Sequence, residues 1–318
     1  MKKVSYLLPI ISLSFLFSNE PITYGWNIPN TPLNVGAYID LMYDEEREGN
    51  VVLDDISLLI SDNHDHFKIL GEVEISNLTL DGKSNNSLDI EINLERLQVG
   101  YAFDDKHHIT VGRFNSDIGF WNQSPINILQ DTTTEPHMLK YVFPKATTGV
   151  MYQNYFSDES SFSMTLQHNE DIGQKDESIV LDRHVALSYH GVIDDFSWRV
   201  AGGFYREINQ FEARYFGLGA EYDVEEFTLQ GELFTQKSNR RENKPYSGYI
   251  QSVWHLFNRQ DAVVRFEGYN DKDLAVEESI YLLGYLYRPR ANMAVKGEYV
   301  YHTELPLNRF VASFSVMF

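Results

Sequence analysis

Charged residues recur at every second position in several stretches of this 318-residue sequence. Glu72 and Glu74 alternate with apolar neighbours, and so do Arg265 and Glu267. Because successive side chains of a β-strand point to opposite faces, residues spaced in this way share one face. Opposed charges around a water-filled passage orient the dipoles of solutes and select the sign of an ion. The chemistry indicated by this spacing is therefore electrostatic sorting of solutes.

The same alternation assigns many charged residues to one polar face. The residues expected on this inner wall are Lys68, Glu72, Glu74, Arg96, Arg113, Arg199, Arg265, Glu267, Lys296, Glu298 and Arg309, with Asp89, Glu91, Glu95, Glu221 and Glu232 as further acids. Acids outnumber bases in this set, which predicts a mild preference for cations. The other residues of this face are mostly Ser, Gly, Thr and Gln, a pattern that argues against an interior filled by large apolar side chains.

A second group of charges lies on the long segment 115–146, which shows no strand pattern. It carries Asp117, Asp131, Glu135, Lys140 and Lys145. A structureless loop of this length inside a compact fold is uncommon and usually functional. We expect it to narrow the passage by facing the charged wall. The alternative is that it covers the mouth of the passage with its charges in water.

Other kinds of site find little support in the sequence. The chain has no Cys, which excludes disulfides, thiol catalysis and Cys-ligated metals. Two close histidine pairs, His64 with His66 and His107 with His108, lack the carboxylate spacing of a recognisable metal site. No G-x-S-x-G nucleophile motif is present. We therefore expect no metal, no cofactor and no enzymatic activity.

The elements that would position these charges are β-strands. Period-two alternation of apolar and polar residues predicts about sixteen strands and no sustained helix. The predicted strands lie near 33–43, 51–61, 66–78, 88–103, 107–114, 147–156, 160–168, 179–191, 196–206, 211–224, 226–236, 246–257, 262–270, 279–288, 291–303 and 307–318. The run at 88–103 changes face between Glu95 and Arg96, which predicts a β-bulge.

The gaps between these strands alternate in size. The even-numbered gaps are short, such as 104–106, 194–195 and 289–290, whereas 81–87, 115–146 and 169–178 are longer odd-numbered gaps. Short turns at one end and long loops at the other are typical of a transmembrane antiparallel β-barrel. In such a barrel the apolar face meets lipid, the polar face meets water, and closure leaves no unpaired strand edge in the bilayer.

The two ends of the chain agree with this fold class. Lys2 and Lys3 precede a short apolar run, which predicts a signal peptide at 1–18, followed by a periplasmic lead-in at 19–32 and the barrel at 33–318. The last strand has an apolar face that ends in Phe318. A formal net charge of −20 disfavours nucleic acid as a partner.

Taken together, these features resemble the Gram-negative outer-membrane porins. The motifs that carry the resemblance are the terminal aromatic Phe318 and the stretch VGRFNSDIGFWNQ at 111–123, whose GRF and GFWN are similar to the strand-to-loop junction of phosphate-selective porins. The resemblance implies an all-β barrel in the bacterial outer membrane, a third loop folded into the lumen, and a homotrimer. It also implies that Phe318 is part of the signal read by the barrel-assembly machinery.

The function expected on these grounds is passive diffusion of small hydrophilic solutes and ions across the outer membrane. Two alternatives remain open at this point. The barrel could be selective for phosphate or other oxyanions, although a wall with more acids than bases argues against it. It could also be a non-conducting adhesin or structural anchor.

Overall fold

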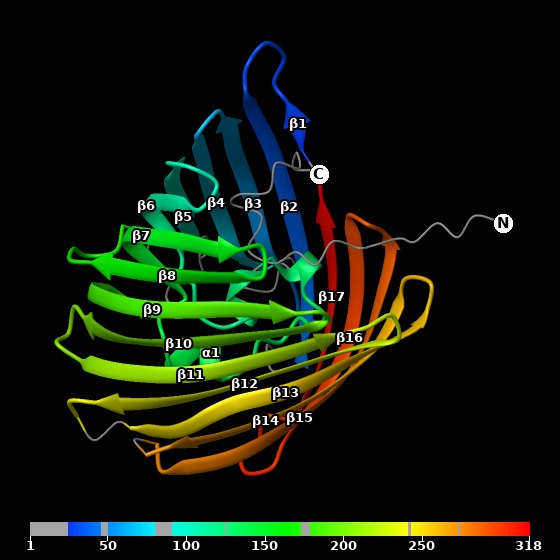
Figure 1. Ribbon diagram of the computed structural model, residues 1–318. Helices are drawn as coiled ribbons and strands as arrows, with labels where there is room; N and C mark the ends of the chain where they lie inside the picture. Colours follow the sequence, from blue (N-terminus) through cyan, green and yellow to red (C-terminus); the bar gives the residue numbers. More distant parts are fainter. Residues whose placement is uncertain are drawn as a thin grey trace.

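The computed structural model describes residues 25–45, 50–79, 91–124, 126–172, 179–240, 243–272 and 274–318 (Figure 1). Strands dominate this part of the chain. Their bounds are β1 (Trp26–Asn27), β2 (Leu33–Asp44), β3 (Asn50–His64), β4 (Phe67–Thr79), β5 (Glu91–Ala102), β6 (His107–Asn115), β7 (Ala146–Ser157), β8 (Ser160–Gln167), β9 (Leu181–Ile193), β10 (Phe196–Glu207), β11 (Glu212–Asp223), β12 (Phe227–Ser238), β13 (Lys244–Phe257), β14 (Gln260–Asp271), β15 (Val276–Arg290), β16 (Met293–His302) and β17 (Arg309–Met317). The predicted signal peptide at 1–18 and residues 19–24 of the predicted lead-in lie outside the described residues.

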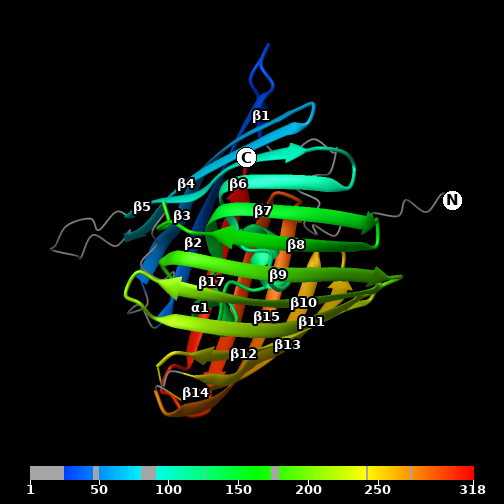
Figure 2. The same ribbon diagram turned by 60° about the vertical axis from the view of Figure 1, so that its left-hand side comes forward.

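Sixteen of these strands, β2 to β17, close into one barrel. Each strand pairs antiparallel with the next along the chain, and β17 pairs with β2, with Ser313 opposite Met42 and Val316 opposite Ile39. Figures 1 and 2 show the resulting ring of strands from two sides. Closure gives every barrel strand two hydrogen-bonded neighbours, which removes the unpaired edges that lipid cannot satisfy. The prediction of an antiparallel barrel with about sixteen strands is confirmed.

Side chains alternate between the two surfaces of the barrel wall, as the last strand shows. Val311, Ser313 and Ser315 are buried on the inner face of β17, whereas Phe310 and the terminal Phe318 are about two-fifths exposed outside. The same alternation on β2 buries Tyr38, Asp40 and Met42 inside. Large apolar residues are therefore exposed around the outer surface, which is the arrangement that a lipid environment favours.

The connections differ between the two ends of the barrel, as predicted. At the short-turn end, tight turns join β3 to β4, β9 to β10 and β13 to β14. Asp65, Asp194 and Arg259 in these turns have positive φ, the conformation that two-residue hairpin turns require. The connections at the other end include the segment between β6 and β7. We refer to these as the short-turn end and the long-loop end.

A β-bulge interrupts β5 at the predicted position. Glu72 of β4 lies opposite Arg96, while the next residue, Val73, lies opposite Leu94, so Glu95 is the extra residue of β5 at this point. The extra residue resets the alternation and turns Arg96 to the inner face together with Gln98. The bulge is therefore what places a guanidinium group beside Glu72.

The start of the described chain lies beside its end. β1 pairs with β2, with Trp26 opposite Val35, and the Trp26 ring stacks on Phe318 at a centroid distance of 6.5 Å. The backbone nitrogen of Phe318 also donates to the carbonyl oxygen of Ala37 at 2.8 Å. These contacts hold the last residue against the seam where β17 meets β2.

The helices that the described residues form between two strands of the barrel lie in the segment between β6 and β7. They are two short 3₁₀ helices, η3 (Trp121–Gln123) and η4 (Asn127–Leu129), and one turn of α-helix, α1 (Met138–Tyr141). Among the described residues, no helix has the length and apolar character needed to cross a bilayer.

Candidate functional site: the segment inside the barrel and its charged wall

The segment from Ser116 to Lys145 runs inside the barrel and contacts the inner faces of β10 to β17. We call it the inner loop. Its two ends are held together, because the backbone nitrogen of Ser116 donates to the carbonyl oxygen of Lys145 at 2.8 Å. The side-chain nitrogen of Asn122 bridges the same two residues, donating to both carbonyl oxygens at 2.7 and 2.9 Å. These hydrogen bonds fix the point at which the loop enters the lumen.

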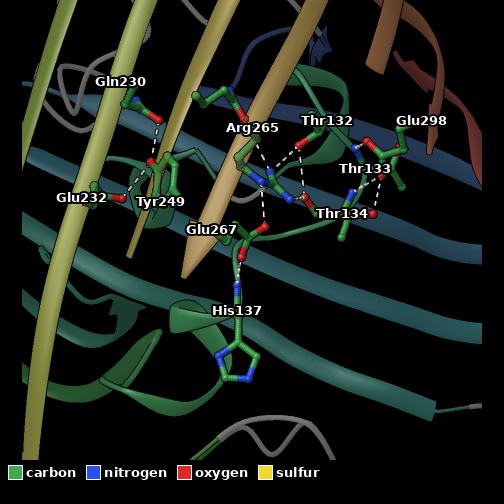
Figure 3. Close-up of polar contacts among 11 residues, drawn as sticks. Thr132, Thr133, Thr134, His137, Gln230, Glu232, Tyr249, Arg265, Glu267 and Glu298 are labelled. Carbon is green, nitrogen blue, oxygen red and sulfur yellow. Dashed lines mark hydrogen bonds and ion pairs between the residues drawn. The ribbon is translucent and has the colours of Figure 1, made fainter. Parts of the chain in front are cut away.

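Glu232 on β12 holds the first part of the inner loop. Its carboxylate accepts the backbone N–H groups of Phe120 at 2.7 Å and Trp121 at 3.4 Å. It also accepts the hydroxyl of Tyr249 at 2.9 Å, as Figure 3 shows. Gly119 makes this approach possible. It has a φ of +70°, and a Cβ atom there would lie 2.4 Å from Oε1 of Glu232. Glycine has neither the Cβ atom nor the conformational penalty.

Two more wall carboxylates hold the middle of the loop in the same way. Glu298 on β16 accepts the backbone N–H groups of Thr133 at 3.1 Å and Thr134 at 2.6 Å, and also the Thr134 hydroxyl. Glu267 on β14 accepts the backbone N–H of His137 at 2.7 Å (Figure 3). Hydrogen bonds from backbone N–H groups to ionised carboxylates are among the stronger ones in proteins. Three acids of the wall therefore serve as anchors for loop backbone.

Arg265 lies at the centre of this contact and is fully buried. Its Nε donates to Glu267 at 2.8 Å, its Nη1 to the hydroxyl of Thr132 at 2.8 Å, and its Nη2 to the carbonyl oxygen of Thr134 at 2.7 Å. The guanidinium also lies 5.2 Å from the ring centroid of Trp121. A buried charge is tolerated only when it is paired and hydrogen-bonded, and these contacts meet that requirement.

The other predicted charges facing the loop are also engaged. Asp117 forms an ion pair of 2.9 Å with Arg199. Nζ of Lys296 donates to the side-chain oxygen of Asn127 at 2.7 Å and to its carbonyl oxygen. Within the loop itself, Lys145 pairs with Glu135 at 2.5 Å. The loop and wall charges that are predicted to face one another across the passage are thus largely engaged in local pairs.

Asp131 meets a base that the sequence did not indicate. It lies 3.6 Å from Arg288 of β15, which also pairs with Asp261 at 3.2 Å and donates to the carbonyl oxygen of Gln130. Arg288 lies just before Pro289 near a turn, where the alternation of β15 is hard to assign, so sequence reasoning missed it.

Of the remaining predicted wall residues, Asp89 lies outside the described residues, and Glu221 lies on β11, where it accepts the side-chain amide of Gln230 at 2.6 Å. The others lie on the part of the barrel formed by β2 to β6 and on β17. Glu72 pairs with Arg96 and also accepts the hydroxyl of Tyr38 at 2.9 Å. Arg309 lies 3.6 Å from Asp44. Of the other residues in this group, Glu74 is buried beside Glu72, Lys68 is half-buried, and Arg113 lies 3.7 Å from Asp171. Glu91 and Glu95 lie on β5.

The interior differs from the expectation in one respect, because large apolar side chains also point inward. Tyr205, Tyr215, Phe234 and Tyr249 of the wall pack against loop residues that include Phe143, forming one buried cluster. The prediction of mainly small polar residues inside is wrong for β10 to β13. Loop positions such as Ile118, Met138 and Leu139 give the signal that could have indicated a buried partner surface.

His137 shows how tightly the loop is packed. Its ring stacks on Tyr269 with a centroid distance of 3.5 Å and an interplanar angle of 3°. Burial lowers the pKa of His137 to about 4, because the protonated ring would lose its hydration. Within the described ranges, no group of three or more His, Cys, Asp or Glu residues could hold a metal ion.

Comparison with known proteins identifies the fold. No family model matches the sequence, and no curated protein sequence matches it. Solved structures that match include OmpF of Salmonella typhi in complex with daunomycin (TM-score 0.67, 12% identity, 90% of this chain and 97% of that chain). An anion-selective porin from Comamonas acidovorans matches with TM-score 0.63 at 12% identity over 90% and 98% of the two chains. The trimer form of in-vitro folded OmpT, an outer membrane protein of Vibrio cholerae, matches with TM-score 0.65 at 11% identity over 90% and 99%. The chain therefore has the fold of the bacterial outer-membrane porins.

Proposed function

We propose that this protein is an outer-membrane channel that lets small hydrophilic solutes and ions diffuse passively and mildly prefers cations. The observation that carries the proposal is the division of the barrel wall, with apolar side chains outside and ionised side chains inside. An ionised inner face is compatible with a water-filled lumen, because water supplies the solvation that lipid or an apolar core would not.

The charge of the inner wall supports the preference for cations. Most charges between the inner loop and β10 to β16 neutralise one another in pairs. On the inner faces of β2 and β4, Asp40, Glu72 and Glu74 are buried, and Arg96 pairs with Glu72. An acidic excess on a lumen wall lowers the energy of a cation in the passage.

Reversal potentials in planar bilayers under a salt gradient test this preference. We expect a reversal potential whose sign indicates selectivity for cations. In Glu74→Gln the reversal potential should be smaller, because one negative wall charge is removed. Glu226→Gln, which removes a charge from the exposed turn between β11 and β12, is the matched control. A preference for anions in the unmodified protein would contradict the charge argument.

The role of the inner loop as a constriction is also part of the proposal. Deleting most of residues 118–142 should raise the single-channel conductance, since the loop and its apolar contacts would leave the lumen. Unchanged conductance in a deletion variant that still forms a folded barrel would show that the loop does not limit flow.

One observation favours a second candidate, a barrel that does not conduct. The buried cluster of Tyr205, Tyr215, Phe234 and Tyr249 with the loop fills part of the interior. Absence of single-channel events from purified, folded protein over a range of voltages would favour this structural role over conduction.

The cellular placement follows from the same proposal. Residues 1–18 direct export, the short-turn end and both termini lie in the periplasm, and Phe318 takes part in recognition by the assembly machinery. The trimer form of the similar Vibrio cholerae protein supports a homotrimer. Light scattering in detergent, corrected for bound detergent, would measure the number of subunits.

A further inference from the structure

A small basic pocket opens at the long-loop end, above the buried cluster. It has a volume of about 150 Å³ and lies between α1 of the inner loop, the connection of β10 to β11 and the connection of β12 to β13. Figure 1 shows α1 within the ring of strands on the side of β10 and β11. Gln236 of β12 fixes α1 there, because its side-chain nitrogen donates to the carbonyl oxygens of Tyr141 and Val142 at 3.0 and 2.9 Å.

The charge of this pocket is opposite to that of the whole chain. Among the described residues that line it, Lys140, Arg240 and Lys244 are basic and Glu207 is acidic. The formal net charge of the protein is −20. A local reversal of sign within an acidic protein concentrates anions where it occurs. Because Lys140 comes from the inner loop, Arg240 from the connection of β12 to β13 and Lys244 from the start of β13, only the folded protein brings them together.

The basic groups are held in position by neighbouring contacts. Lys244 is largely buried and lies 3.4 Å from Asp271. The guanidinium of Arg240 lies 5.7 Å from the ring centroid of Phe211 and donates to the carbonyl oxygen of Asn209 at 3.1 Å. Groups fixed in this way lose less conformational entropy when an anion binds.

Aromatic rings form the rest of the pocket. Phe211 and Tyr205, which are buried, line it together with Tyr141, which is half exposed. Apolar ring faces beside a few fixed polar groups are characteristic of small-molecule sites. The volume is below the roughly 300–1,000 Å³ of pockets for drug-sized ligands, so the ligand must be small.

We propose that this pocket binds a single sugar ring that carries one carboxylate or phosphate group. The anionic group contacts Lys140, Arg240 and Lys244, and the ring lies against Tyr141 and Phe211. This site is separate from the charged contacts that anchor the inner loop to Glu232, Glu267 and Glu298. It does not depend on conduction, and its test is therefore a binding measurement that stands apart from the proposed channel activity.

Isothermal titration of the full chain in detergent at low salt tests the site with glucuronate and glucose 6-phosphate, and with glucose as the neutral control. We expect at least one of the two anions to bind about tenfold more tightly than glucose, since a charge-assisted contact adds that much or more. Whichever anion binds more tightly identifies the charged group that the site prefers. No binding of either anion, or equal binding of glucose, would overturn the proposal.

Variants distinguish binding of the anion in the pocket from a general attraction of anions to charges on the protein surface. Lys140→Gln and Arg240→Gln should each weaken binding of the anion about tenfold. Tyr141→Ala should weaken it about threefold through loss of the ring contact. Lys106→Gln, at the opposite end of the barrel, removes the same charge and should leave the affinity unchanged. An equal loss in Lys106→Gln, or no loss in the two pocket variants, would refute the site.

Discussion

Arg265 and Glu267, two residues apart on β14, form a buried ion pair 2.8 Å long, and each of them also binds the inner loop. Arg265 holds Thr132 and Thr134, while Glu267 holds the backbone of His137. The pair therefore connects the barrel wall to the inner loop. Its charges largely neutralise each other, so their main effect is on the position of the loop.

Replacing Arg265 by Met should destabilise the protein by about 3–5 kcal/mol, because Glu267 would remain buried without its partner. Loss of the contacts to Thr132 and Thr134 should also make the conductance larger and noisier. Thermal unfolding in detergent and single-channel recording measure the two effects. In the double variant Arg265→Met with Glu267→Leu the loss in the free energy of unfolding should be smaller than in Arg265→Met alone. A loss equal to the sum of the losses in the two single variants would contradict this account.

Gly119→Ala should displace the first part of the inner loop. The new Cβ would clash with Oε1 of Glu232, and the positive φ adds a cost of about 1–3 kcal/mol. Susceptibility of the loop to protease, together with conductance, would report the displacement. Gly268→Ala is the matched control, because its Cβ would meet only ordinary contacts at 3.8 Å and beyond. If both variants behave alike, the close approach of Gly119 to Glu232 has no importance.

Acid should loosen the part of the loop around His137. Its pKa is about 4 inside the protein, below the ordinary value of 6.5, so the undocked ring takes up a proton at a pH where the docked ring does not. The contribution to docking is complete above pH 6.5 and is lost as pH falls from 6.5 towards 4. Asp271 and Glu278 nearby favour the protonated ring, whereas Lys140 and Lys244 oppose it.

Protease cleavage of the inner loop or the noise of the current would report loop opening between pH 7 and pH 4. His137→Gln should reduce the pH dependence in the window from 6.5 to 4, because this side chain does not titrate. An identical pH profile in the variant would assign the effect to the carboxylates and not to His137.

Phe318→Ala should lower the amount of barrel assembled in the outer membrane far more than it lowers the stability of the folded protein. The ring is partly exposed on the outer face and stacks on Trp26, and loss of this ring pair should cost about 0.5–1.5 kcal/mol beyond the area that the ring buries. Membrane fractionation and thermal unfolding would be compared. Trp26→Ala removes the same ring contact from the other side, and an equal assembly defect in that variant would show that packing, and not recognition of the terminal residue, is responsible.

Much of the architecture could be predicted from the order of residues. Alternation along 307–318 identified the outer face of β17, and the break at Glu95 and Arg96 located the bulge in β5. Both inferences succeed because a strand has a period of two, so a side chain's face follows from local sequence alone. The same rule placed Arg265, Lys296 and Glu298 inside, although β15 was too ambiguous for Arg288.

Which inner residues meet was decided only by the tertiary structure. Alternation gives the face of a residue but neither its height nor its angle around the barrel, so the pairing of Asp117 with Arg199 had no local signal. The inner loop has no strand period, and its path depends on backbone N–H groups that reach Glu232 and Glu298 from positions far away in the sequence. The sequence by itself determined the wall and the sign of its charges. Closure of the barrel determined which of those charges hold the loop, because contacts between distant residues exist only once the strands have paired.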